Sequence, residues 1–371
     1  MESSPLSSRL TRRDFLRALP IAAAAATACR RRPYRQEDFA VPSRSAVGLL
    51  PAADYNVDTT DIVFRGLALL GLEVKGRRVL LKPNLVEYEP GTAINTHPLV
   101  VAGAAVAFLR AGASEVVVGE GPGHRRDIEY LLTASGLYEH LRELRIRFVD
   151  LNHDDVKAVA LRSAFTGFGE LWLPVEVLKA DVVVSLAKLK THHWAGMTAS
   201  MKNLFGTVPG AVYGWPKNPL HLRGVQESIL DLSSTIRPAF SIVDAIVAME
   251  GDGPIMGRPR PLGFIAMSRD SVALDATCAR IIGLDPVKMT YLAEASRFLG
   301  NVDERRIDQR GESPARYRTR FDLPPHLQNL LSVAEPRATT AGEMRIAERF
   351  PTFRPQSTER HHAQPVEQTA P

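Results

Sequence analysis

Short apolar segments alternate with longer amphipathic segments over most of this chain. The short segments have the length and continuous apolar character of buried strands, and they include residues 79–81, 116–118, 181–186 and 263–267. The longer segments carry apolar residues three or four positions apart, which predicts helices at 96–112, 127–144, 225–236 and 270–283. Because such strands and helices alternate, the pattern predicts an α/β fold with a doubly wound, mostly parallel sheet and helices on both faces.

Cap and turn residues indicate where these elements begin and end. Thr96 is expected to cap the helix that has Pro98 in its first turn, and Gly112 is expected at its C-terminal end. Asp127 is expected to cap the next helix. Residues 151–174 contain strand-like pieces such as AVAL and predict a β extension of the domain.

The same pattern divides the chain into four regions. Residues 1–29 have the layout of an export signal, and residues 30–45 form a linker rich in Pro and Arg. Residues 46–310 form the α/β domain. Residues 311–371 are rich in Pro, Arg, Thr and Gln without a sustained period, which predicts an extended or disordered C-terminal tail.

The N-terminal region resembles a twin-arginine export signal. Arg12 and Arg13 precede an apolar stretch at 19–28, which is shorter than the roughly 20 residues needed to span a bilayer. An amphipathic helix or a membrane anchor is the alternative. Cys29 ends a sequence similar to a lipobox, so either lipidation of Cys29 or ordinary cleavage nearby would follow export. We expect the twin-arginine export machinery to be a partner, and a periplasmic or other extracytoplasmic location with or without a lipid tether.

The numbers of charged residues and cysteines limit the kinds of partner and site that the protein can have. The chain has 46 Lys and Arg against 41 Asp and Glu, and much of the excess lies near the N-terminus, so its charge gives no indication of nucleic-acid binding. Two cysteines, Cys29 and Cys278, are too few for a disulfide framework, a cysteine-ligated zinc or an iron–sulfur cluster. Cys278 lies in an apolar helical pattern and is expected to be a small core residue.

Polar clusters follow four of the predicted strands. Since the carboxyl ends of parallel strands gather at one edge, we expect these clusters to form a single crevice. The clusters are residues 82–84, 119–124 and 188–193, and Asp244 with 250–254. A buried carboxylate is costly without a partner, so Asp244 needs a cation, and lysines from neighbouring strand ends are the candidates.

The residue types in these clusters suit the binding of a small anion. Lys190 and His192 are the catalytic candidates, because buried lysines shift their pKa readily and histidine titrates near neutral pH. The substrate-binding candidates are Lys82, Asn84, Gly121, Lys188, Thr191, Thr198, Lys202 and Asn203. The candidates for balancing the lysines or binding a divalent metal are Glu120, Asp244, Glu250 and Asp252.

Each cluster also has an ordinary structural interpretation. The glycine-rich segment 119–123 can be a strand-to-helix turn, because no G-x-G-x-x-G dinucleotide motif can be written there. Residues 82–84 can be a simple turn, and Lys202 with Asn203 can lie on a solvated helix face. His192 and His193 are adjacent, so on an extended segment they point in opposite directions and make a poor metal-binding pair.

Taken together, these segments resemble the DUF362 family, a domain of unknown function. The resemblance covers about residues 75–286 and is most specific in LKTHHWAGMTASMKNLFG, followed by EGDGPIMG. Many members of that family carry a ferredoxin-type cluster domain, which implies a redox association. This chain departs from that version because Cys278 is the one cysteine after the export signal. The expected fold is also loosely similar to that of lactate racemases, but no motif of theirs can be matched residue by residue.

We therefore expect an exported enzyme that acts on a small anionic carboxylate or phosphate in a crevice lined by lysine and histidine. An extracytoplasmic protein that binds a small anion without transforming it remains an alternative, as does an accessory protein of a membrane redox system. The sequence leaves the cofactor unknown, with a divalent metal as one option.

Overall fold

A computed structural model describes residues 32–124 and 127–332, and its centre is a mixed, mostly parallel sheet. Within these residues the sheet has nine strands in the order β11-β1-β10-β9-β7-β2-β3-β4, with β8 paired to β7. The strands are β1 (Ser45–Pro51), β2 (Arg78–Pro83), β3 (Glu115–Glu120), β4 (Arg147–Asp150), β7 (Val182–His192), β8 (Gly196–Thr198), β9 (Phe240–Glu250), β10 (Arg258–Ser268) and β11 (Ile307–Gly311). The predicted fold class is confirmed.

Strand direction decides where the polar clusters meet. Strands β4, β3, β2, β7 and β9 are mutually parallel, whereas β10 runs antiparallel to both β9 and β1. The carboxyl ends of β2, β3, β7 and β9 therefore lie at the same edge of the sheet.

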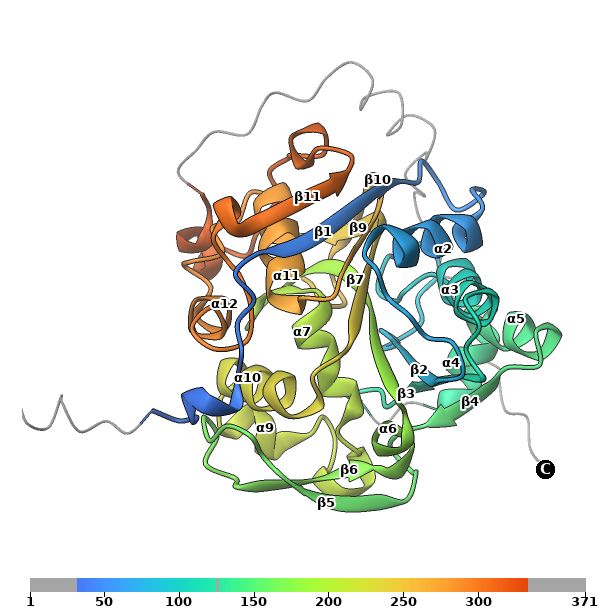
Figure 1. Cartoon of the computed structure of the whole chain (residues 1–371), viewed down its shortest axis with the longest axis horizontal. Coiled ribbons are helices and arrows are strands. Elements are labelled where there is room, and N and C mark those ends of the chain that lie inside the picture. Colours follow the sequence, from blue (N-terminus) through green and yellow to red (C-terminus); the bar gives the residue numbers. More distant parts are fainter. Residues whose placement is uncertain (1–31, 125–126, 333–371) are drawn as a thin grey trace, which may run out of the picture.

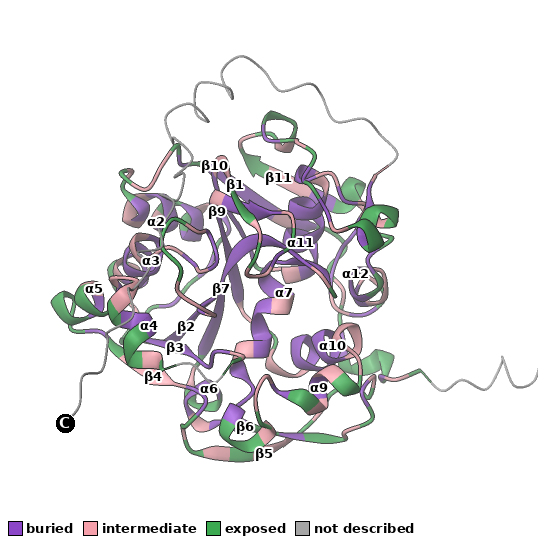
Figure 2. Cartoon of the chain, turned by 180° about the vertical axis from the view of Figure 1, so that it is seen from behind, coloured by how far each residue is buried: buried purple, intermediate pink, exposed green. Residues whose placement is uncertain are grey.

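Helices cover both faces of the sheet (Figure 1). One face carries α2 (Thr59–Leu69), α3 (Pro98–Arg110), α4 (Ile128–Ala134) and α5 (Leu137–Glu143) over a core that includes Leu67, Phe108 and Leu141. The other carries α7 (Ser200–Asn203), α10 (Val225–Ile236), α11 (Ser271–Ile281) and α12 (Thr290–Ala295). Figure 2 shows the buried sheet between these two layers. Cys278 is buried in α11, as expected.

Shorter helical segments complete the chain. The remaining α-helices are α6 (Val175–Lys179), α8 (Gly210–Tyr213) and α9 (Asn218–Leu222). The 3-10 helices are η1 (Gln36–Asp38), η2 (Leu204–Thr207), η3 (Glu304–Arg306), η4 (Pro314–Arg316) and η5 (Pro325–Leu330).

The observed helix caps match the predicted caps in part. Asp127 caps α4 through the backbone N–H groups of residues 129 and 130. The predicted helix 127–144 is two helices, because Gly136 has a φ of 79° between α4 and α5. The N-cap of α3 is His97 rather than Thr96. Thr96 instead donates to the Leu186 carbonyl oxygen and accepts from the Asn84 N–H, which ties the ends of β2 and β7 together.

The packed part of the chain is longer than residues 46–310. Tyr34 and Phe39, in the predicted linker, are buried beside Phe298. After residue 310, Phe321 and Leu327 are buried in the same core cluster, so residues 311–332 pack onto the domain. The predicted β extension is present as a hairpin of β5 (Val156–Ala160) and β6 (Glu170–Pro174). The predicted export signal and the remainder of the predicted tail lie outside the described residues.

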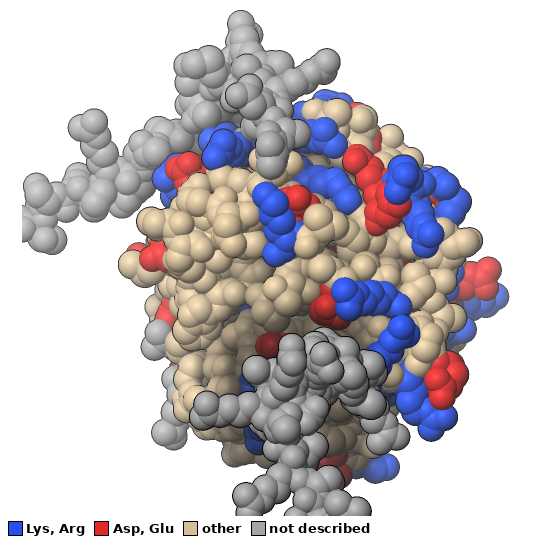
Figure 3. Space-filling view, turned by 90° about the vertical axis from the view of Figure 1, so that its left-hand side faces the viewer, with Lys and Arg blue, Asp and Glu red and all other residues tan. Residues whose placement is uncertain are grey.

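The surface carries charges of both signs. On the face seen in Figure 3, lysine and arginine side chains are interspersed with aspartate and glutamate. Among the helices that the structure describes, none combines the length and the apolar character needed to cross a membrane.

Candidate ligand-binding site

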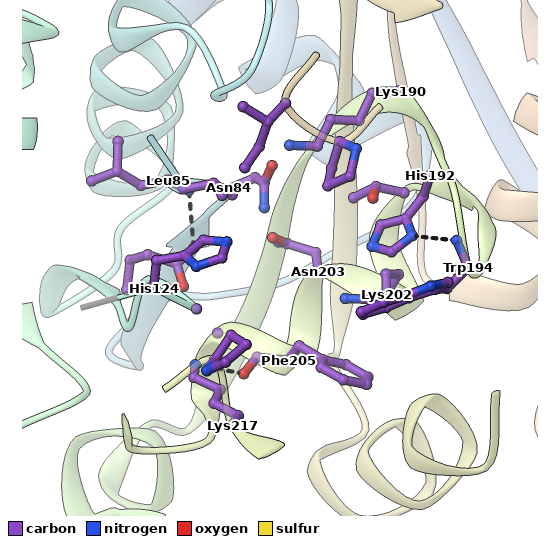
Figure 4. A pocket seen from close by; sticks show the side chains of 18 of the residues that line it. Asn84, Leu85, His124, Lys190, His192, Trp194, Lys202, Asn203, Phe205 and Lys217 are labelled. Carbon is purple, nitrogen blue, oxygen red and sulfur yellow. Dashed lines mark hydrogen bonds between the residues drawn. The ribbon is translucent and has the colours of Figure 1, made fainter. Parts of the chain in front are cut away.

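The ends of parallel strands meet around one cavity of about 440 Å³ (Figure 4). Strand β2 pairs in parallel with β3 and β7, and α7 and η2 also contribute residues to the cavity lining. The predicted site residues that line it are Lys82, Asn84, Glu120, Gly121, Lys190, His192, Thr198, Lys202, Asn203 and Asp252. Residues from the carboxyl ends of β2, β3, β7 and β9 are thus brought together as the parallel topology predicts, with Thr198 from β8 and two residues from α7.

A buried ion pair forms part of the cavity wall. Lys82 Nζ lies 2.5 Å from a Glu120 carboxylate oxygen, and the two side chains are 0% and 1% exposed. The same Nζ donates to Asn203 Oδ1 at 2.8 Å. Burial lowers the pKa of Lys82, against the opposing effect of Glu120. A Cβ atom at Gly206 would collide with both charged groups, so glycine permits the close approach of this loop.

Lys190 faces the cavity without a carboxylate partner. It is 1% exposed, and its Nζ donates to the Ile94 carbonyl oxygen at 2.7 Å. Burial lowers its pKa well below the ordinary value of a lysine, and the neighbouring Lys202 adds to this effect. Among the neighbouring charges Glu120 opposes this shift, and an anion in the cavity would add counter-charge near Lys190.

Lys202 and Lys217 complete the cationic lining. Lys202 Nζ lies 3.8 Å from the centre of the Phe205 ring, a cation–π contact. Lys217 is 1% exposed and donates to the carbonyl oxygens of Gly121 and Phe205 at 2.7 and 2.9 Å. Burial lowers the pKa of each of these two lysines to about 7, so bound anions and pH both affect their charge.

The hydrogen bonds of His192 fix which ring nitrogen carries its proton. Its Nδ1 accepts from the backbone N–H groups of Trp194 and Ala195 at 3.1 and 3.3 Å. The neutral ring therefore carries its proton on Nε2. Burial lowers the pKa of His192 well below its ordinary value. The structure thus makes His192 a hydrogen-bond donor, whereas its titration range alone had indicated proton transfer at neutral pH.

Two further histidines have the opposite tautomer. Nδ1 of His193 lies 3.0 Å from the Gly253 carbonyl oxygen, and Nδ1 of His221 lies 3.2 Å from that of Lys217. A carbonyl oxygen only accepts, so each Nδ1 donates and each Nε2 is left as a proton acceptor. Burial lowers the pKa of His221, which keeps it neutral at pH 7. Both rings line the cavity.

Lys188 and Asp244 form a second buried pair outside the cavity lining. Lys188 Nζ donates to Asp244 at 2.7 Å, to Tyr55 Oη at 2.8 Å and to the Val247 carbonyl oxygen at 2.9 Å. The prediction that a strand-end lysine neutralises Asp244 is confirmed. The register of β7 against β9 shifts after Lys188, so that Lys190 pairs with Met249. Lys188 bonds Asp244, where this irregularity begins, and Val247 within it.

Thr191 and Glu250 also lie outside the cavity lining. Thr191 Oγ1 donates to the Gly251 carbonyl oxygen at 2.8 Å. Glu250 accepts from Arg258 Nε at 3.1 Å and lies 3.7 Å from Arg260. These contacts fasten the segment that carries Asp252, so Glu250 balances arginines and not the lysines of the site.

Sequence reasoning missed the residues that loops bring to the cavity. These are chiefly Trp194, Lys217, Ile255 and Met256, together with His221 from the short helix α9. His124 belongs to the predicted cluster 119–124 and lines the cavity as expected. Lys217 stands between two prolines in WPKNP, which marks a turn but does not reveal its path back to the strand ends.

No metal centre is evident in the part of the chain that the structure describes, since no three His, Cys, Asp or Glu side chains are grouped to hold an ion. The two acidic residues of the cavity differ in their surroundings. Glu120 is paired with Lys82, whereas Asp252 is exposed.

Comparison with known proteins identifies relatives. The model of a family described as a domain of unknown function, DUF362, matches residues 79–280. The chain is 34% identical to the thylakoid-associated protein sll1697 of Synechocystis sp. over 231 residues, which are 60% of this chain and 68% of that protein.

Two solved structures are more distantly similar. The lactate racemase apoprotein from Thermoanaerobacterium thermosaccharolyticum is 14% identical, with a TM-score of 0.39, over 66% of this chain and 59% of that one. A crystal structure of a protein from Thermotoga maritima is 16% identical, with a TM-score of 0.36, over 62% of this chain and 59% of that one.

Proposed function

The chain belongs to the DUF362 family, a family of unknown function, and from that premise we propose that it is an enzyme whose lysine- and histidine-lined cavity takes a small anionic substrate. The observation that carries this proposal is the charge of the cavity lining. Four lysines line it, at 82, 190, 202 and 217, against the two carboxylates of Glu120 and Asp252. Buried charge of one sign is costly unless it is compensated, and an anionic carboxylate or phosphate would compensate it.

We assign different roles to the polar side chains of the cavity. Lys190, Lys202 and Lys217 hold the anion, and His192 donates a hydrogen bond to it from Nε2. His221 Nε2 is available to accept a proton from the substrate.

The side chain of Asn84 favours a substrate that also carries a hydrogen-bond donor. Its Oδ1 is buried and has no hydrogen-bond partner among the described residues, although an unpaired buried acceptor is unfavourable. Its side chain lies at the cavity (Figure 4). A hydroxyl or a protonated acid oxygen on the substrate would satisfy it.

Calorimetric titration tests the anion site. Inorganic phosphate and acetate are titrated separately into the protein and into its Lys202→Met and Lys190→Met variants. At least one anion should bind, and each variant should bind it at least tenfold more weakly. Lys75→Met, which changes an exposed lysine outside the cavity, should bind as the original protein does. Failure of both anions to bind at millimolar concentration would refute the proposal.

A second experiment separates an enzyme from a binding protein. Carboxylic acids and phosphate esters that bind are incubated with the protein and followed by proton and phosphorus NMR. Catalysis is supported if the original protein converts a ligand and the His221→Gln variant does not. The variant should still bind that ligand within tenfold of the original affinity. His192→Gln retains an N–H donor and should keep binding. Recovery of every bound compound unchanged would leave the alternative, an anion-binding protein without catalysis.

We also propose that the protein is exported by the twin-arginine machinery and works in the periplasm or another extracytoplasmic space. The support is the segment from Arg12 to Cys29, which lies outside the described residues. Replacing Arg12 and Arg13 with lysine should retain the protein in the cytoplasmic fraction. Replacing Cys29 with alanine should release it from the membrane fraction if lipidation tethers it. Unchanged fractionation of the double lysine variant would refute twin-arginine export.

A further inference from the structure

Part of the cavity lining is apolar and lies among its lysines. Six hydrophobic side chains line it, Leu85, Val86, Trp194, Phe205, Ile255 and Met256. They come from the loop after β2, the turn between β7 and β8, η2 and the loop after β9. Four separate segments thus contribute apolar surface to a cavity that also holds four lysines.

Two of these side chains, Trp194 and Met256, are exposed to solvent. Trp194 is 56% exposed and Met256 is 78% exposed. Single exposed hydrophobic residues are common on protein surfaces, but these two line the same cavity and adjoin buried apolar residues. Trp194 also contacts the rings of His193 and His221 edge-on, with ring centres 4.6 and 5.1 Å apart. The indole is therefore held beside the histidines of the site.

The size of the cavity exceeds what an inorganic anion requires. Its volume of about 440 Å³ falls in the range of roughly 300–1,000 Å³ that is typical of pockets for organic ligands. Such pockets combine a mostly apolar lining with a few polar groups that fix orientation. Here the lysines can bind the charged group of a ligand while the apolar side chains contact its uncharged part.

We propose that the ligand is an amphiphilic anion, with a carboxylate or phosphate head at the lysines and an apolar chain or ring against Trp194 and Met256. This inference rests on the proposed anion site and adds its substrate class. The head group gives most of the electrostatic attraction, and the apolar substituent adds affinity because it leaves water when it contacts these side chains.

The test compares ligands that share a head group and differ in their apolar part. Methyl and hexyl phosphate form one pair, and acetate and heptanoate form the other. Each is titrated calorimetrically into the full-length protein. In the pair whose head group binds, the longer compound should bind at least tenfold more tightly, which is about 1.4 kcal/mol.

Variants locate the apolar contact. Trp194→Ala and Met256→Ser should each reduce the preference for the longer compound at least threefold, while the affinity for the short one stays within twofold. Trp172→Ala is the matched control, because Trp172 is 44% exposed but does not line the cavity. It should leave the preference unchanged.

The outcomes distinguish the two proposals. Equal affinity for the short and long compounds would overturn the amphiphilic ligand and leave the anion site standing. A preference that survives both cavity variants would also overturn it, because the apolar part would then bind elsewhere. Absence of binding by all four compounds would overturn both proposals.

Discussion

Replacing Lys82 with methionine would leave the Glu120 carboxylate buried without a cation beside it. Both side chains are at most 1% exposed, and their charged atoms lie 2.5 Å apart. Breaking a buried pair in this way costs about 3–5 kcal/mol. Asn203 Oδ1 would lose the Lys82 donor as well, which adds about 1 kcal/mol. We therefore expect Lys82→Met to lower the free energy of unfolding by about 4 kcal/mol or more.

The complementary change, Glu120→Gln, should cost less, because glutamine keeps a side-chain oxygen that can accept a hydrogen bond from Lys82 Nζ. Burial already lowers the pKa of Lys82, and removing Glu120 removes the interaction that opposes this shift. In Glu120→Gln the pKa of the Lys82 amine should therefore fall further below its ordinary value. The double variant contains no buried charge at this position. It should be more stable than Lys82→Met alone by about 2 kcal/mol, so the coupling energy between the two positions is about 2 kcal/mol plus the cost of Glu120→Gln.

Urea unfolding followed by circular dichroism measures all three variants against the original protein. The exposed pair Glu139 and Arg142 provides the control, since both side chains are more than half exposed. Arg142→Met should change stability too little to resolve. A cost below about 1 kcal/mol for Lys82→Met, or single costs that simply add in the double variant, would refute the buried, coupled pair.

Two further predictions concern the cavity. Acetate should bind more weakly as pH rises from 6 to 8, because Lys202 and Lys217, whose pKa values are about 7, lose the protons that attract the anion. The affinity should fall about tenfold if one lysine contacts the ligand and about hundredfold if both do. Calorimetry at constant ionic strength measures this affinity at each pH. An affinity that stays constant or rises with pH would contradict the prediction. Gly206→Ala should lower the free energy of unfolding by about 1–3 kcal/mol, because its Cβ would meet the fixed Glu120 carboxylate. Gly123→Ala, at an open position of the same cavity, should have little effect, and equal urea midpoints for the two variants would refute the steric argument.

The alternation of apolar strands and amphipathic helices was sufficient to predict the sheet and the edge at which the polar clusters gather. Parallel strands place their carboxyl ends together whatever the loops do, so Lys82, Glu120 and Lys190 could be assigned to one crevice from their positions after strands. The need of Asp244 for a cation also followed from burial alone, because an unpaired carboxylate in an apolar strand is unfavourable.

Tertiary structure decided which of these residues reach the ligand cavity. Lys188 and Lys190 are two positions apart in one strand, where a regular pleat places both on the same face. The shifted register of β9 separates their environments, so Lys188 is paired with Asp244 while Lys190 faces the cavity.

Lys217 and His221 reach the cavity through the path of a loop and a short helix. Local sequence does not encode that path, because it depends on packing against residues distant in the chain. The tautomer of His192 likewise depends on two backbone N–H groups that only the folded turn aims at its Nδ1. Sequence alone determined the residue types and the edge of the sheet at which they gather. Contacts between distant segments determined which lysines have a carboxylate partner and which ring nitrogen of His192 carries the proton.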